Sequence, residues 1–249
     1  MVTCCGARTP ASDVPMLAQM SFLLLLLNAS VCHAAGFPAP SGKFTFDGKS
    51  YTGTATLTNT SITNKSLYLN GEYFTGYVGK EAERRGKGYT AVFRPLVFDY
   101  RKFTAVVKLC PENISHGATL LVGGTSCRWF VMRAGSDGRI ELAFNNFQVR
   151  HSVESLTVTN GQWLTLAITF DLQSRRVIMY ANGARADEVV LPEDFTLDVM
   201  NDAKWKESDK VLTFTDYANG GTFQGFVAGL LTFNSILDPN QMRRLFPRN

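Results

Sequence analysis

The chain has 249 residues and an apolar fraction of 45%, which is ordinary for a chain that folds around a hydrophobic core and suits one large β domain or two small ones. Its net charge is +4 with both signs mixed along the chain. This mild bias argues against a nucleic-acid-binding protein, which normally has a much more basic face. Basic groups concentrate only in "GKEAERRGKG" at 79–88, where glycines and mixed charges favour a solvated loop over a polyanion site.

The first segment of the chain has the features of a secretory signal peptide. Residues 22–27 form an apolar run, which is too short to cross a bilayer because a spanning helix needs about 20 apolar residues. The small residues Cys32 and Ala34 lie three positions before and directly before a cut after Ala34. We therefore expect 1–34 to be a cleaved signal peptide and 35–249 to be a secreted or extracytoplasmic domain without stable membrane insertion.

Two features of this segment leave other interpretations open. The region before the apolar run has little net positive charge, since Arg8 is opposed by Asp13. This region is also long, so that a true start of the protein at Met16 or Met20 stays open. An uncleaved membrane anchor is the competing interpretation, which the shortness of the apolar run disfavours.

Removal of this leader also decides how the cysteines are interpreted. Cys4, Cys5 and Cys32 leave with it, so that Cys110 and Cys127 remain. Two cysteines in an exported chain predict one disulfide, because that compartment is oxidising. Two separately buried thiols are the alternative, since a bridge requires Cα atoms within about 7 Å of each other.

The remainder of the chain has the pattern of an all-β protein. From about residue 43 onward, short alternating or apolar runs are separated by Gly, Asn, Asp and Ser, and no segment keeps an apolar stripe of helical spacing for long. The regular spacing of these runs predicts a sandwich of two sheets. The expected strands are 42–46, 66–69, 103–109, 119–122, 128–133, 140–144, 155–159, 163–170, 176–180, 184–190, 210–215 and 225–233.

Two turns are marked by their residue types. Asn182 and Gly183 separate two runs that can pair, and Asn-Gly is the favoured type I′ hairpin corner because both central residues need a positive φ. "GSDGR" at 135–139 uses Asp and Gly in the same way. Both stretches therefore predict tight connections between neighbouring strands.

One short helical turn is expected near the end of the chain, at 237–246. Asp238 can cap it and Pro239 fits its first position, while Met242, Leu245 and Phe246 fall on one side. We expect this turn to close the domain after the last strand.

Five stretches in chain order carry a family resemblance: "LYLNGEYFTG", "FTAVVKL", "DGRIELAF", "GQWLTLAITFDLQSRRVIMYANGAR" and "FQGFVAGLLTFNSILDPNQMRRLF". Together, over about residues 43–248, the chain resembles the laminin G-like domains of the concanavalin A-like lectin and glucanase superfamily. The resemblance implies a jelly-roll sandwich of two curved antiparallel sheets. It implies several functions, since such domains bind sugars, bind proteins, carry calcium or space other domains.

Enzymatic activity is not expected. Glycoside hydrolysis needs two carboxylates at a fixed separation, and the Glu-x-Asp-x-x-Glu spacing of the β-glucanase branch of this superfamily does not occur in the sequence. Glu141 stands alone, which favours solvated surface over an acid or base. His116 and His151 are the histidines left after the leader, and neither a nucleophile-elbow spacing nor a zinc motif accompanies them.

Calcium is a candidate cofactor, because related lectin domains hold it on loop oxygens. Asp216 and Asn219, in the turn "DYANGG", could supply hard oxygen ligands. A turn stabilised by its own Asx side chains, without an ion, is the favoured alternative because no run of acidic ligand positions is present.

A sugar site needs aromatic rings that stack on apolar sugar faces and planar polar groups that bind hydroxyls. Trp129 lies in an apolar strand, so a core position is its alternative, and Trp163 packs in the sandwich by resemblance. Trp205 lies among charged residues, which argues for exposure. The candidate ligand-binding residues are Trp205, Tyr217, Asn145, Asn146 and Trp129.

The sequence therefore predicts a secreted lectin-like module that binds a glycan without cleaving it. An extracellular adhesion or structural domain that binds protein is the alternative, and a glycoside hydrolase of the same fold is the third interpretation. A groove lined by Trp, Tyr, Asn and Arg would favour glycan, whereas a flat apolar patch would favour protein.

Overall fold

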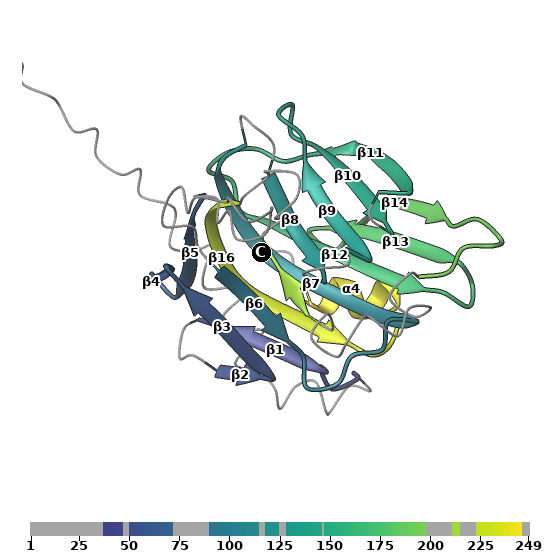
Figure 1. The fold of residues 1–249 in the computed structure, drawn as a ribbon, viewed down its shortest axis with the longest axis horizontal. Coiled ribbons are helices and arrows are strands. Elements are labelled where there is room, and N and C mark those ends of the chain that lie inside the picture. Colours follow the sequence, from purple (N-terminus) through teal and green to yellow (C-terminus); the bar gives the residue numbers. More distant parts are fainter. Residues whose placement is uncertain are drawn as a thin grey trace, which may run out of the picture.

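The computed structural model describes residues 37–46, 50–71, 90–114, 118–124, 128–145, 147–197, 211–214 and 223–245. These residues form two stacked antiparallel sheets and one short helix (Figure 1). The predicted signal peptide, 1–34, lies outside the described residues. Within the described part of the chain, no helix has the length and apolarity needed to cross a bilayer.

The first sheet has nine strands, and its main path runs β14-β13-β12-β7-β16-β1-β2. β5 also pairs with β16, and β4 pairs with β5. The strands of this sheet are β1 (Gly42–Thr45), β2 (Ser50–Thr52), β4 (Ser61–Thr63), β5 (Ser66–Asn70), β7 (Lys102–Asn113), β12 (Leu164–Asp171), β13 (Arg176–Ala181), β14 (Ala184–Val190) and β16 (Gln224–Phe233).

The second sheet has seven strands in the order β11-β10-β9-β8-β15-β6-β3. They are β3 (Thr54–Thr58), β6 (Thr90–Arg94), β8 (Ala118–Gly123), β9 (Phe130–Ala134), β10 (Arg139–Phe144), β11 (Val149–Thr157) and β15 (Leu212–Thr213). The two sheets and the C-terminal helix α4 (Pro239–Leu245) make the predicted all-β antiparallel jelly-roll sandwich with a short C-terminal helical turn.

Strand β7 shows how the chain fills the space between and outside the sheets. Successive side chains of a strand point to opposite faces, and Phe103, Ala105 and Val107 enter the core between the sheets. Val106 points the other way, into a second cluster on the outer face of the first sheet. Almost all of β7 is consequently buried on both faces, which explains why its apolar residues do not alternate with polar ones along most of its length.

Helix α4 covers this second cluster. Met242 and Leu245 are buried against it, as the sequence predicted. The helix begins with reciprocal hydrogen bonds: the Gln241 amide donates to Asp238 Oδ1 at 2.8 Å, and the Asp238 amide donates to Gln241 Oε1 at 2.9 Å. This is the capping arrangement that Asp238 predicted, while Phe246 lies outside the described residues.

The hairpin between β13 and β14 has the predicted corner. Asn182 and Gly183 have φ angles of 49° and 79°, both in the left-handed region that a type I′ turn requires. The Asn182 side-chain oxygen also accepts a hydrogen bond from the Thr165 amide at 3.0 Å. The corner is therefore tied to the neighbouring strand β12.

Candidate functional site

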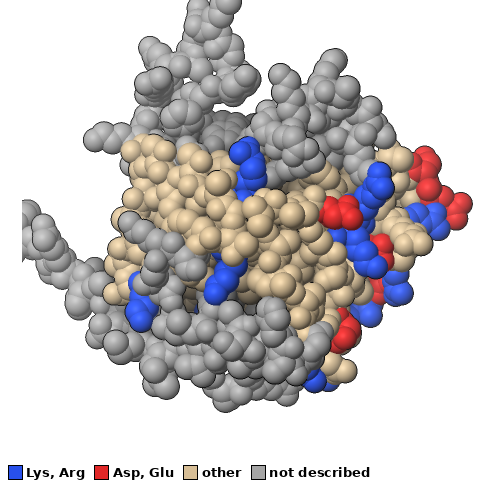
Figure 2. All heavy atoms as spheres, turned by 90° about the horizontal axis from the view of Figure 1, so that it is seen from below, with Lys and Arg blue, Asp and Glu red and all other residues tan. Residues whose placement is uncertain are grey.

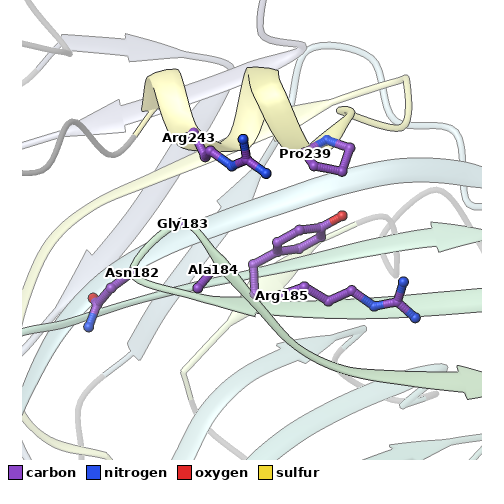
Figure 3. A pocket seen from close by; sticks show the side chains of 7 residues that line it. Asn182, Gly183, Ala184, Arg185, Pro239 and Arg243 are labelled. Carbon is purple, nitrogen blue, oxygen red and sulfur yellow. The ribbon is translucent and has the colours of Figure 1, made fainter.

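A hollow lies on the outer face of the first sheet, where helix α4 passes over the hairpin of β13 and β14 (Figure 3). Its volume is about 490 Å³. The residues that line it come from these two elements: Tyr180, Asn182, Gly183, Ala184, Arg185, Pro239 and Arg243. The hairpin and the helix were each predicted, but they are far apart in sequence, so that only the fold brings them together.

The inner wall of the hollow is formed by Tyr180. Its side chain is buried in the cluster beneath α4. Burial raises the pKa of the Tyr180 hydroxyl above its ordinary value, an effect that nearby Arg185 opposes and Asp238 reinforces. The hydroxyl is therefore protonated at neutral pH and can donate a hydrogen bond.

Guanidinium groups approach the hollow from both elements. Arg243 extends from α4 and Arg185 extends from the strand side (Figure 3), where it lies opposite Tyr180 in the β13–β14 register. Arg185 and Arg176 both pair with the single carboxylate of Glu188, so that these three groups together carry a net positive charge. In the space-filling view, charged groups of both signs gather on the side where Figure 1 places β13 and β14, and much of the rest of the described surface on this face is uncharged (Figure 2).

The polar groups around the hollow are held in place. The hydrogen bond from Thr165 fixes the Asn182 amide plane, and Arg243 Nη1 donates to Asn240 Oδ1 at 3.4 Å. The Pro239 ring adds an apolar surface. Planar donors around a partly apolar concavity are the chemistry that recognises a small polar ligand.

One candidate residue, Trp129, is wrongly assigned by the sequence. Its side chain is 0% exposed and packs between the sheets against Phe98, Tyr100 and Phe103 at ring-centroid distances of 5.7, 5.2 and 5.5 Å. Gly123 makes room for the indole, since an added Cβ there would lie 2.3 Å from a ring carbon. Trp129 is a core residue and cannot stack on a sugar in this structure.

Asn145 is likewise structural. It is 4% exposed, and its Nδ2 donates to the Thr196 carbonyl at 2.6 Å. It has a φ of 49° at the end of β10, a conformation that Asn adopts more readily than most residues. The assignment of Asn145 to the ligand site is therefore corrected.

The other predicted site residues lie outside the described part of the chain: Asn146, Trp205, Tyr217, Asp216 and Asn219. Stacking by Trp205 and Tyr217, and calcium binding by Asp216 and Asn219, therefore stay predictions. Among the described residues, no cluster of three or more His, Cys, Asp or Glu side chains is arranged to hold a metal ion.

The disulfide expected at Cys110 is not confirmed. Cys110 is a buried free thiol, and its expected partner Cys127 lies outside the described residues. Burial raises the pKa of the Cys110 thiol to about 11, and the carboxylate of Glu112 adds to this shift.

Sequence reasoning missed Tyr180, Arg185 and Arg243 as site residues. The alternation along β13 and β14 shows which residues share a face, but it does not show what covers that face. The chain order shows only that α4 follows directly after β16. That β16 lies two strands from β12 in the first sheet is seen in the structure alone.

No protein-family model matches the chain, and no curated protein sequence matches it. Solved structures share its fold. Domain 4 of AbnA, a GH43 extracellular arabinanase from Geobacillus stearothermophilus, in complex with arabinotriose, is 16% identical with a TM-score of 0.58, over 84% of this chain and 98% of that domain.

Two toxin structures are similar at the same level. The binding domain of botulinum neurotoxin DC in complex with SialylT is 12% identical with a TM-score of 0.57, over 83% of this chain and 50% of that one. The binding domain of Paraclostridial Mosquitocidal Protein 1 is 12% identical with a TM-score of 0.59, over 83% and 51%. The chain thus spans about half the length of these binding domains, and at this identity the likeness shows the fold.

Proposed function

We propose that this chain is a secreted lectin-like module that binds a glycan without cleaving it, and that the hollow between α4 and the β13–β14 hairpin is its site. One observation carries the proposal: the hollow is lined by Tyr, Asn and Arg side chains together with Pro239. This is the lining that distinguishes a sugar groove from a flat apolar protein-binding patch.

The geometry suits a sugar in several respects. A volume of about 490 Å³ is within the usual range of ligand pockets, about 300 to 1,000 Å³. A guanidinium presents parallel N–H donors in a fixed fork, so Arg185 and Arg243 can each bind neighbouring sugar hydroxyls. The Pro239 ring can contact the C–H face of a sugar ring.

The comparisons support the same proposal. A domain of this fold and of similar length belongs to an arabinanase and is known in complex with arabinotriose. A toxin binding domain that contains this fold is known in complex with SialylT. Membership of the laminin G-like group and a location outside the cytoplasm are part of the proposal.

Binding without cleavage is part of the proposal, and the described lining of the hollow consists of Tyr, Asn, Gly, Ala, Arg and Pro residues. Hydrolysis requires a pair of carboxylates. Glu141 lies on the second sheet, where Arg133 Nη2 contacts its Oε2 at 3.1 Å.

An adhesion module that binds protein is the second candidate. Leu96 and Val97 are adjacent, apolar and exposed after β6, and this small surface could contact a protein. These two side chains lack the polar donors that line the hollow, so that glycan binding is favoured.

A glycan array on the purified chain, with and without chelator, tests the proposal. The best glycan is then titrated by calorimetry against Arg243→Gln and Arg185→Gln, with Arg139→Gln as the matched control because Arg139 is 68% exposed at the β9–β10 turn. We expect each hollow variant to weaken binding about tenfold, the effect of one lost charge-assisted hydrogen bond, and the control to bind normally. The proposal fails if no glycan binds, or if the hollow variants bind as well as the control.

A further inference from the structure

The hairpin of β4 and β5 carries a chemical motif that the hollow does not use. Asn64, Lys65 and Ser66 form an Asn-x-Ser sequon, which accepts an N-linked glycan when its middle residue is not proline. Asn64 and Lys65 are the two loop residues between the paired positions Thr63 and Ser66. The acceptor asparagine therefore lies at the tip of a hairpin.

The conformation of this turn explains only part of the motif. Asn64 and Lys65 have φ angles of 49° and 62°, the pair of left-handed conformations found in a type I′ corner, which asparagine adopts more readily than most residues. The corner makes no such demand on Ser66, the first residue of β5. The complete sequon therefore needs a reason beyond the geometry of the turn.

The Asn64 side chain can carry a bulky group without loss of a contact in the fold. Asn64 is exposed, and its amide has no hydrogen-bond partner among the described residues. A second sequon, at 59–61, begins just before β4, but Asn59 already interacts with other groups of the chain. Of these two asparagines, Asn64 is therefore the better acceptor.

The strand beside this turn is one that a glycan would protect. β4 lies at an edge of the first sheet, because among the described strands it pairs with β5 alone. All three of its residues are exposed, and Ile62 is 38% exposed. An open strand edge can pair with another chain, so that natural proteins cover or charge such edges. A glycan on Asn64, two residues from Ile62, is bulky and solubilising and would cover this edge.

We propose that Asn64 is an N-glycosylation site whose glycan covers the β4 edge. The inference rests on the export of the chain that the proposed function includes, because the sugar donor, a lipid-linked oligosaccharyl diphosphate, belongs to the export route. In the transfer, Asn64 Nδ2 forms a bond to the anomeric carbon of the sugar, and the bond from that carbon to the diphosphate oxygen breaks. The amide loses a proton, and the lipid diphosphate leaves with the bonding electrons.

Ser66 indicates when the transfer takes place. It is 2% exposed in the folded hairpin, so that a transferase that recognises the sequon hydroxyl can reach it only before β4 and β5 pair. Asn64 is consequently modified during export, ahead of folding, and its glycan stays exposed afterwards.

The glycan would leave the hollow open. β16, β7 and β12 separate β5 from β13 in the first sheet, and Figure 1 shows β4 and β5 on the opposite side of the molecule from β13 and β14. The modification and the proposed glycan-binding site can therefore be tested separately.

The test is export of the full chain, leader included, from cultured insect and mammalian cells. The secreted protein is treated with peptide-N-glycosidase in heavy-oxygen water, which converts a glycosylated asparagine to labelled aspartate, and mass spectrometry reads the peptide that contains Asn64. We expect the label at Asn64 in most molecules. Asn64→Gln and Ser66→Ala should each abolish it because each destroys the sequon, whereas Asn160→Gln, at an exposed asparagine outside a sequon, should leave it unchanged.

The protective role has its own readout, which is self-association measured by light scattering. Asn64→Gln should associate more than the glycosylated chain, and addition of Ile62→Thr should reverse this increase, because threonine suits a strand but removes the exposed apolar group. Equal scattering of the glycosylated chain and Asn64→Gln would overturn the protective role.

Other outcomes separate the modification from the binding function. An exported chain with unlabelled Asn64 from both kinds of cell, or a label that persists in Ser66→Ala, would overturn the site. A labelled Asn64 in a chain that binds no glycan on the array would support this site while the proposed binding function fails. A chain that stays inside the cell with its leader attached would count against both the export and the site.

Discussion

Replacing Trp129 with alanine tests the placement of this side chain between the sheets. The indole is completely buried among Phe98, Tyr100 and Phe103, and truncation of a buried aromatic lowers the free energy of unfolding by about 3 to 5 kcal/mol. For a domain of this size, a loss of about 4 kcal/mol corresponds to a fall of about 8 to 16 °C in melting temperature. Urea unfolding followed by circular dichroism measures the change.

Trp129→Phe is the matched control. Trp129 Nε1 is buried without a hydrogen-bond partner among the described residues, so that phenylalanine removes ring volume but no hydrogen bond. We expect it to cost clearly less than alanine, and both variants that stay folded should bind glycan normally. A loss below about 1 kcal/mol for Trp129→Ala, together with weaker glycan binding, would refute the core placement and restore Trp129 as a ligand residue.

Three further predictions follow from buried positions. Gly123→Ala places a Cβ 2.3 Å from the Trp129 ring and should lower the free energy of unfolding by about 1 to 3 kcal/mol in the same assay; an unchanged midpoint would contradict it. The pKa of Cys110 is about 11, so iodoacetamide at pH 8 should not label Cys110 in the folded chain and should label it once the chain is unfolded, as mass spectrometry of the Cys110 peptide measures; a Cys110 that stays unlabelled in the unfolded, unreduced chain would instead support the disulfide. Burial lowers the pKa of Lys108 to about 8 from the ordinary 10.5, so that between these values the unfolded chain binds a proton that the folded chain does not. The free energy of unfolding should therefore rise with pH from about 8 to 9, below the range in which thiols ionise. Lys108→Met should not show this rise, and a pH profile identical to that of the unmodified chain would count against the lowered pKa.

The sequence predicted elements best where apolar residues alternate strongly or where a turn has a specific chemistry. β14 begins and ends at the expected residues, and Asn182 and Gly183 form the expected corner. Helix α4 was predicted from Asp238 and Pro239 because capping is a local interaction, independent of the rest of the fold.

Strands with a weak apolar pattern were missed. β3, "TATLT", turns only Ala55 and Leu57 toward the core and buries neither fully, and β4 is wholly exposed, so that the apolar signal of both is weak. β11 begins at Val149, before the predicted 155, because its first half is polar and Val153 is its one buried residue. Such strands form because neighbouring strands pair with them, which no local pattern records.

The candidate site could not be predicted because its parts meet only in three dimensions. Arg185 occupies an exposed position of β14 and Arg243 an exposed position of α4, so that no local pattern marks either as a site residue. Trp129 was misassigned because a tryptophan can stack on a ligand or pack in a core, and the face to which a strand residue points depends on the register of its strand. Asn145 was misassigned because an asparagine can bind a ligand or occupy a turn position with positive φ.

The most direct test of the account is a crystal structure of the chain with the tightest glycan from the array. The account predicts a sugar ring in the hollow between α4 and the β13–β14 hairpin, with hydroxyls within hydrogen-bond distance of Arg185 or Arg243 and no cleaved product. A glycan bound elsewhere, with this hollow filled only by solvent, would contradict it.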